Sequence, residues 1–113
     1  MDANRGLIDA FSHIHRRIFP MSRVVLKLEP RLDTAAAGNL ANAILENAKC
    51  DLELDASQVT HLGALALQVL RAAARSWHQD DVALTMTGVS TDCADQINLL
   101  GFAPDNICRW DRD

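Results

Sequence analysis

Three short segments of alternating apolar and polar residues, each followed by a segment with helical periodicity, constrain the fold of this chain most strongly. In chain order these segments are 23–29, 34–48, 51–55, 64–78, 82–86 and 92–100. A strand, a helix and a second strand in this order form a unit in which the strands run parallel and the crossover is right-handed. We therefore expect an α/β fold with a parallel sheet.

The alternation within the strands also predicts how the sheet is covered. Val24, Leu26 and Leu28 share one face of the first strand, and Leu52 and Leu54 share one face of the second. A parallel strand covered on both faces would instead be apolar at nearly every position. The sequence thus predicts a small sheet with helices mainly on one face.

Polar residues and glycine mark where the helices begin and end. Asp33 is expected to cap the first of the three helices rather than to act as a catalytic acid, and the stretch Val89-Ser90-Thr91 is expected to cap the last. Gly101 is expected to end that last helix. Beyond it, the sequence predicts a short final strand over residues 106–110.

The N-terminal segment, 1–20, differs from the rest of the chain. Leu7, Phe11, Ile14 and Ile18 follow helical spacing, and Pro20 ends the segment. Its formal charge is +1, whereas residues 21–113 carry −5. We predict an amphipathic helical extension over 1–20 and one domain over 21–113. The extension could pack on the half-covered sheet or mediate a homodimer.

Composition excludes several classes of function. A net charge of −4 and 4% aromatic residues argue against nucleic acid as the partner. No apolar run is long enough to span a membrane, and no signal-peptide pattern precedes the first strand. The three cysteines, Cys50, Cys93 and Cys108, are expected to be free thiols in a reducing cytoplasm.

No catalytic motif accompanies the α/β pattern. The phosphate-binding loop, the nucleophile elbow and paired metal-binding cysteines do not occur. A phospho-receiver domain would need a lysine near its last strand, but the two lysines are Lys27 and Lys49. We therefore expect no enzyme activity, no metal site and no cofactor.

The stretch from Asp55 to Leu67, D-A-S-Q-V-T-H-L-G-A-L-A-L, resembles the signature of STAS domains, the fold of bacterial anti-sigma-factor antagonists. That signature has the form D-x-S-x-V-x-x-apolar-D-S-[ST]-G-L. The resemblance continues at Leu32-Asp33 and at 99–102, L-L-G-F, and covers residues 23–110. It implies a module that acts by binding a protein partner.

The sequence departs from the family pattern where the regulatory site is expected. An aspartate and then a serine or threonine that a partner kinase phosphorylates stand in the family where this chain has Gly63 and Ala64. Alanine cannot be phosphorylated, so the resemblance implies a module that binds without this switch. Ser57 and Thr60, in the same loop, are the alternative modification sites.

The resemblance places the partner-binding surface around the start of the helix over 64–78. The residues expected to form it are Asp33, His61, Gly63, Ala64, Leu65, Gln68 and Arg71. A simpler interpretation of Arg71 and Arg75 is a solvated helix face. The run over 67–77, with Leu62-Gly63 before it, resembles small STAS proteins of alphaproteobacterial chemotaxis gene clusters. This favours docking on a chemotaxis histidine kinase; the alternatives are an anti-sigma kinase and the ATPase of a lipid-transport ABC system.

Overall fold

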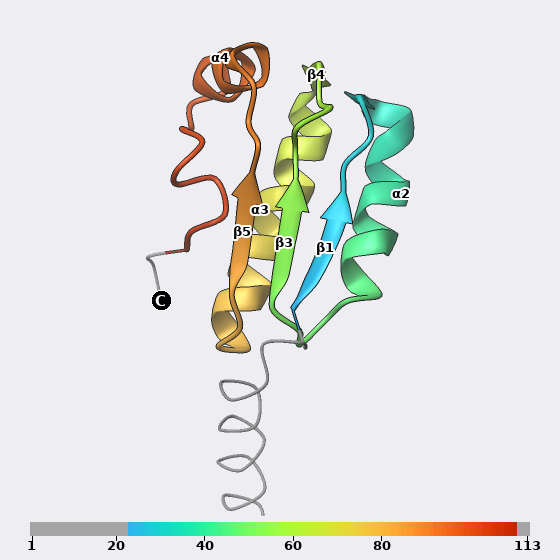
Figure 1. Cartoon of the computed structure of the whole chain (residues 1–113), viewed down its shortest axis with the longest axis vertical. Coiled ribbons are helices and arrows are strands. Elements are labelled where there is room, and N and C mark those ends of the chain that lie inside the picture. Colours follow the sequence, from blue (N-terminus) through green and yellow to red (C-terminus); the bar gives the residue numbers. More distant parts are fainter. Residues whose placement is uncertain (1–22, 111–113) are drawn as a thin grey trace, which may run out of the picture.

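The computed structural model describes residues 23–110 (Figure 1). The helix predicted over 1–20 lies outside the described residues. The elements are β1 (Val24–Lys27), β2 (Arg31–Leu32), α2 (Thr34–Leu45), β3 (Leu52–Asp55), β4 (His61–Leu62), α3 (Ala64–Gln79), β5 (Leu84–Thr87) and α4 (Thr91–Leu99).

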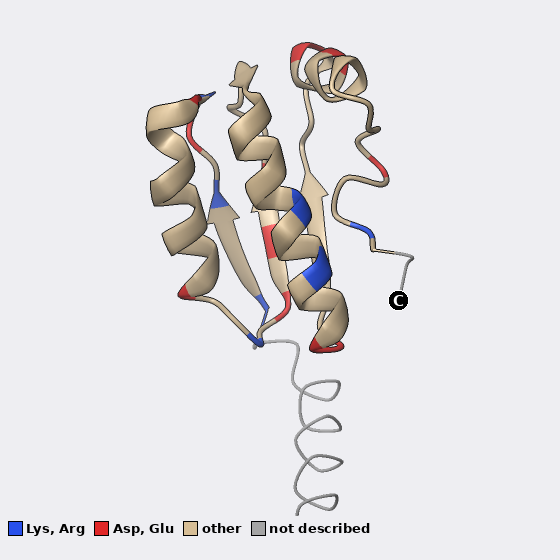
Figure 2. Cartoon of the chain, turned by 180° about the vertical axis from the view of Figure 1, so that it is seen from behind, with Lys and Arg blue, Asp and Glu red and all other residues tan. Residues whose placement is uncertain are grey.

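The main sheet has the strand order β1-β3-β5, and both pairs of strands are parallel. Both crossovers step in the same direction, and right-handed crossovers of that kind place their helices on one face. Figure 1 shows α2 and α3 behind the sheet, and Figure 2, from the opposite side, shows them side by side in front of it. The predicted α/β fold with helices mainly on one face is confirmed.

The core lies between the sheet and these two helices. The alternation in β3 buries Leu52 and Leu54, as predicted, and they pack with Leu70 and Trp77 of α3. The indole N–H of Trp77 donates to the carbonyl of Cys50 at 2.7 Å, which ties the end of α3 to the turn before β3. A buried indole needs such an acceptor, because an unpaired buried donor is costly.

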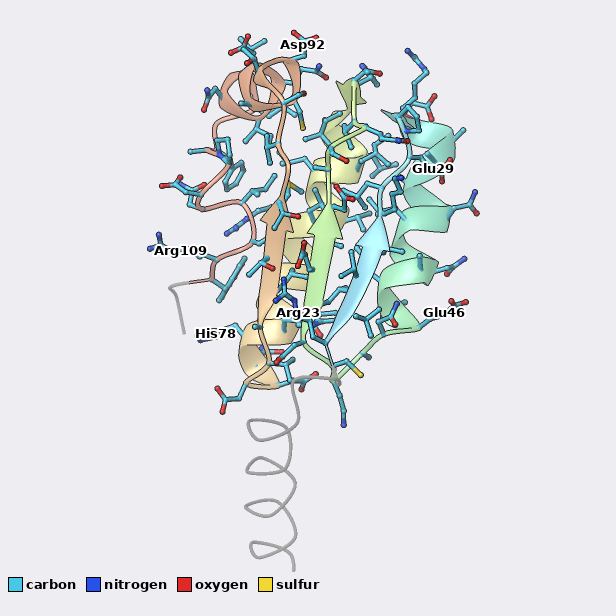
Figure 3. All side chains as sticks on the ribbon, viewed as in Figure 1. Arg23, Glu29, Glu46, His78, Asp92 and Arg109 are labelled. Atoms are coloured by element: carbon cyan, nitrogen blue, oxygen red, sulfur yellow. The ribbon has the colours of Figure 1, made fainter. Side chains whose placement is uncertain are left out.

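The opposite face of the main sheet carries polar side chains. Arg23 lies over this face (Figure 3) and forms an ion pair with Glu53 of the central strand. The other carboxylate oxygen of Glu53 accepts a hydrogen bond from the Thr87 hydroxyl at 2.8 Å. Glu53 of the central strand therefore links the residue before β1 to β5 on the side that α2 and α3 leave uncovered.

Two of the three helices begin at the predicted cap residues. The carboxylate of Asp33 accepts from the backbone N–H of Ala36, and the hydroxyl of Ser90 accepts from that of Cys93. Gly101, at a φ of 94°, follows α4 and ends it as predicted. The cap expectations for Asp33 and Ser90 are confirmed.

The predicted final strand over 106–110 is wrong. These residues form turns held by local hydrogen bonds, among them that of the Ile107 N–H to the Ala103 carbonyl at 3.0 Å. Figures 1 and 2 show this C-terminal segment alongside β5 and α3. Ile107 is fully buried in the core, so its apolar character reflects packing and not a strand.

Arg71 explains how this segment is held without a neighbouring strand. Its Nη1 donates to the carbonyls of Asn106, Ile107 and Arg109 at 2.8–3.1 Å. The guanidinium also lies 4.7 Å from the ring centre of Phe102 and 5.0 Å from that of Trp110. The interpretation of Arg71 as part of a solvated helix face is therefore wrong.

All three cysteines are unpaired in the structure, as predicted. Burial raises the pKa of the Cys108 thiol to about 12.

In the part of the chain that the structure describes, no helix combines the length and apolarity needed to cross a membrane.

Candidate functional site

Two short strands bring the starts of α2 and α3 together. β2 and β4 pair in parallel beyond the main sheet, with Arg31 opposite His61 and Leu32 opposite Leu62. Each strand runs directly into a helix cap, Asp33 for α2 and Gly63 for α3. A Cβ added to Gly63 would lie 3.8 Å from the Cα of Asp33. The two helix N-termini are therefore neighbours at one end of the molecule.

These two N-termini are capped differently. The Asp33 carboxylate accepts the Ala36 N–H at 3.0 Å, whereas no side chain caps the first turn of α3. The first N–H groups of a helix have no partners within the helix and carry partial positive charge. The start of α3 therefore offers hydrogen-bond donors that the described residues do not cap with a side chain.

Apolar side chains surround those donors. Ala64 is exposed, and Leu65 is 44% exposed although it is a large hydrophobic residue. His61 is half-buried, and its Nε2 would lie 3.7 Å from a Cβ at position 63. The surface formed by Asp33, His61, Gly63, Ala64, Leu65 and Gln68 is called the docking face below.

The loop before this face is fixed by one carbonyl. The oxygen of Pro30 accepts the backbone N–H groups of Thr60 and His61 at 2.8 and 3.1 Å. It also accepts the hydroxyl of Thr60 at 3.1 Å. Ser57 and Thr60 are both exposed, but a modified Thr60 would lose that hydroxyl bond.

A side-chain amide completes the outer edge of β4. The Oε1 of Gln96 accepts the Leu62 N–H at 2.6 Å, and its Nε2 donates to the Thr60 carbonyl at 2.8 Å. These are the two bonds that a neighbouring strand would make. Gln96 was not predicted as a residue of the site, because nothing in the sequence distinguishes it from an ordinary polar residue of α4.

The beginning of the loop is fixed by Asp55 and Gly88. Hydrogen bonds from the backbone N–H and the side chain of Ser57 hold the pKa of the Asp55 carboxyl below its usual value, with a smaller contribution from the nearby Lys27 charge. Gly88 has a φ of 70°, and a Cβ there would lie only 3.0 Å from the Cβ of Ser57. Asp55 thus shapes the loop. The backbone at position 88, directly after β5, approaches this loop so closely that only glycine fits there.

Of the seven predicted partner-binding residues, Asp33, His61 and Gly63 lie close together at the paired helix starts, and Ala64, Leu65 and Gln68 follow in the first turns of α3. Arg71 lies two turns further along α3, where its guanidinium binds carbonyls of the C-terminal segment. Among residues 23–110, no group of three or more histidine, cysteine, aspartate or glutamate side chains could hold a metal ion. The face combines the exposed apolar residues Ala64 and Leu65 with the polar residues Asp33, His61 and Gln68.

Comparison with known families identifies the fold. A family model described as "Mlab, STAS domain" matches residues 17–104, which is most of the chain. The chain belongs to the STAS domain family. STAS domains are protein-interaction and regulatory modules.

A solved structure supports the same fold for this STAS domain. The "sulfate transporter family protein from Wolinella succinogenes" is similar with a TM-score of 0.62 and 20% sequence identity. The match covers 74% of this chain and 70% of that one. The likeness concerns the fold alone. A search of curated proteins finds no match.

Proposed function

We propose that this STAS domain is a non-catalytic, cytoplasmic docking module that binds a signalling kinase through its docking face and lacks the family's phosphorylation switch. The observation that carries the proposal is the start of α3. Gly63 leaves its first turn without a side-chain cap, Ala64 has no hydroxyl, and Leu65 is exposed beside them.

The chemistry of the docking face supports an apolar contact with one acceptor group. A partner side chain can pack on Ala64 and Leu65 while its carboxylate or carbonyl accepts from the uncapped N–H groups. A phosphate at position 64 would add about −1.5 to −2 charges at that point. Because alanine excludes it, binding is constitutive unless another residue regulates it.

Within this function, a chemotaxis histidine kinase is the partner that we favour, because of the resemblance over residues 67–77. An anti-sigma kinase and the ATPase of a lipid-transport ABC system are the alternatives. STAS subunits of the transport systems usually keep a serine or threonine at the position of Ala64, which counts against that role here.

A pull-down from native cell extract with matched variants tests the proposal. Leu65→Asp changes the docking face, and Leu99→Asp makes the same change at an 86% exposed leucine on α4. We expect a histidine kinase to be captured by the wild-type chain and by Leu99→Asp, but not by Leu65→Asp. Equal capture by both variants would place the interface elsewhere, and capture of the transporter ATPase would reassign the pathway.

The absence of the switch has its own test. Incubation of the chain with the captured kinase and ATP, followed by mass spectrometry, should show no phosphate. A phosphate on Ser57 or Thr60 would show that the switch has moved within the loop.

A further inference from the structure

An apolar groove runs between α2 and α3 on the side away from the sheet. It has a volume of about 200 Å³. Its lining residues are Ala41, Ile44, Leu45, Val69, Ala72, Ala73, Ser76 and Trp77. Leu45 is 65% exposed at its edge. Small residues on both helices allow a third helix to approach closely.

The surface around the groove carries little charge. α2 contains no charged residue, and the two arginines of α3 are its only formal charges. The guanidinium groups of Arg71 and Arg75 both lie over the ring of Trp110, in the C-terminal segment. An exposed apolar surface of this kind marks a contact site.

We propose that the N-terminal segment of this chain, residues 7–18, occupies the α2–α3 groove as an amphipathic helix. Leu7, Phe11, Ile14 and Ile18 form its apolar stripe. This contact requires no other protein, so it can be tested independently of the proposed partner.

The position at which the described chain begins favours this occupant. The Val24 N–H donates to the carbonyl of Asp51 at 2.9 Å, and the neighbouring Cys50 carbonyl accepts the Trp77 indole at 2.7 Å. Trp77 lines the groove. The first strand therefore starts beside one end of the groove, and residues 19–22 are left to make the turn.

The length of the segment also agrees with that of the groove. At the usual rise of an α-helix, a helix over positions 7–18 would be about 18 Å long. The groove-lining residues of α3 extend from Val69 to Trp77, which is about 12 Å at the same rise. The proposed helix is therefore long enough to cover the groove.

Charge favours the same arrangement. Glu46 and Asp80, both exposed, cap the C-termini of α2 and α3, and Figure 3 shows Glu46 at that end of α2. The negative ends of the two helix dipoles add to these carboxylates. Arg16 and Arg17 lie just before positions 19–22, so the proposed arrangement brings them towards Glu46 and Asp80. The basic residues Arg23 and Lys49 also lie at this end, and Arg23 is already paired with Glu53.

The uncovered sheet face is a poorer match for an apolar stripe. Its outward residues include Lys27, Glu53, Thr85 and Thr87, and Glu53 is already bound to Arg23 and Thr87. Val25 is its one large exposed hydrophobic residue among those described. Four large apolar side chains would gain less there than in the groove.

A nitroxide label at position 12 tests the proposal by NMR. The label is attached to Ser12→Cys in the full chain carrying Cys50→Ser and Cys108→Ser, because Cys93 is buried. We expect the amide signals of Ala72 and Ser76 to lose more intensity than that of Thr85 on the sheet face. The double substitution Phe11→Asp and Ile14→Asp in the labelled chain should restore the signal intensities of Ala72 and Ser76.

A mixed sample distinguishes one chain from two. Isotope-labelled chain without nitroxide is combined with nitroxide-labelled chain without isotope, and we expect no loss of signal. Loss at Ala72 in this sample would mean that the segment of a second copy fills the groove, which overturns the proposal. Strongest loss at Thr85, or no loss anywhere, also overturns it.

Discussion

The side-chain oxygen of Gln96 accepts a hydrogen bond from the Leu62 N–H, 2.6 Å away, and so joins α4 to the short strand that leads into the docking face. The same amide donates to the Thr60 carbonyl. Through these two bonds, the position of the α3 N-terminus depends on a side chain from a different helix, far along the chain.

Gln96→Ala should therefore destabilise the domain. The change leaves a part-buried backbone N–H and a carbonyl without partners, which costs about 1–3 kcal/mol in the free energy of unfolding. Urea denaturation measures the loss, and hydrogen exchange at Leu62 should accelerate. Asn98→Ala, at an exposed position of the same helix, is the control and should change the free energy of unfolding by less than about 0.5 kcal/mol. Equal effects of the two variants would contradict the role given to Gln96.

Arg71→Ala should release the C-terminal segment. Three carbonyls of residues 106–109 lose a charged donor, and the rings of Phe102 and Trp110 lose their cation. Because the site is partly exposed, we expect a loss of about 2 kcal/mol in the free energy of unfolding. Arg71→Lys should recover only part of it, since an ammonium lacks the planar guanidinium.

Arg75→Ala provides the comparison for Arg71. Arg75 is exposed and lies 5.9 Å from the ring centre of Trp110. Its removal should cost about 0.5 kcal/mol or less. Chemical denaturation followed by circular dichroism compares all three variants, and an Arg75→Ala effect as large as that of Arg71→Ala would refute the assignment.

Two glycines should respond in opposite directions to alanine. Gly88→Ala forces a side chain into a φ of 70° and places its Cβ 3.0 Å from Ser57, so we expect a loss of more than about 1 kcal/mol. At Gly38, inside α2, an added Cβ meets no atom within 4 Å. Gly38→Ala should stabilise the domain by about 0.5–1 kcal/mol. Thermal unfolding of both variants checks the signs.

Acid should weaken the loop before the docking face through Asp55. The hydrogen bonds from Ser57 make the pKa of this carboxyl lower in the folded than in the unfolded chain. The stabilisation is thus present above the unfolded pKa of about 3.9 and is lost as the pH falls through the folded value. Wild type and Asp55→Asn should differ in unfolding free energy at pH 6 and converge towards pH 2–3. A constant difference over this range would exclude the carboxylate as the cause.

The parts of the fold that depend on local sequence were predictable. Alternation located the three strands of the main sheet, and Asp33 and Ser90 located two helix starts, because a side chain and its backbone partner lie three residues apart. β2 and β4 were not predicted, since two residues cannot show a periodicity.

The contacts between distant parts of the chain could not be predicted. The strand expected over 106–110 does not form, and a side chain from α3 donates to carbonyls there that a neighbouring strand would otherwise have bonded. At the site, helical periodicity located the start of α3, and the family resemblance suggested a partner-binding surface there. Neither periodicity nor motif indicated that Gln96 and the Pro30 carbonyl hold it in place.

The three donors that converge on the Pro30 carbonyl have a thermodynamic consequence for association. A loop already fixed by backbone bonds loses little conformational entropy when a partner arrives. A flexible recognition loop would have to offset the entropy cost of its ordering when it binds. Here that cost already falls on folding. If this face binds a partner as proposed, the affinity depends on the side chains that meet, and single substitutions should change it without a change in backbone conformation.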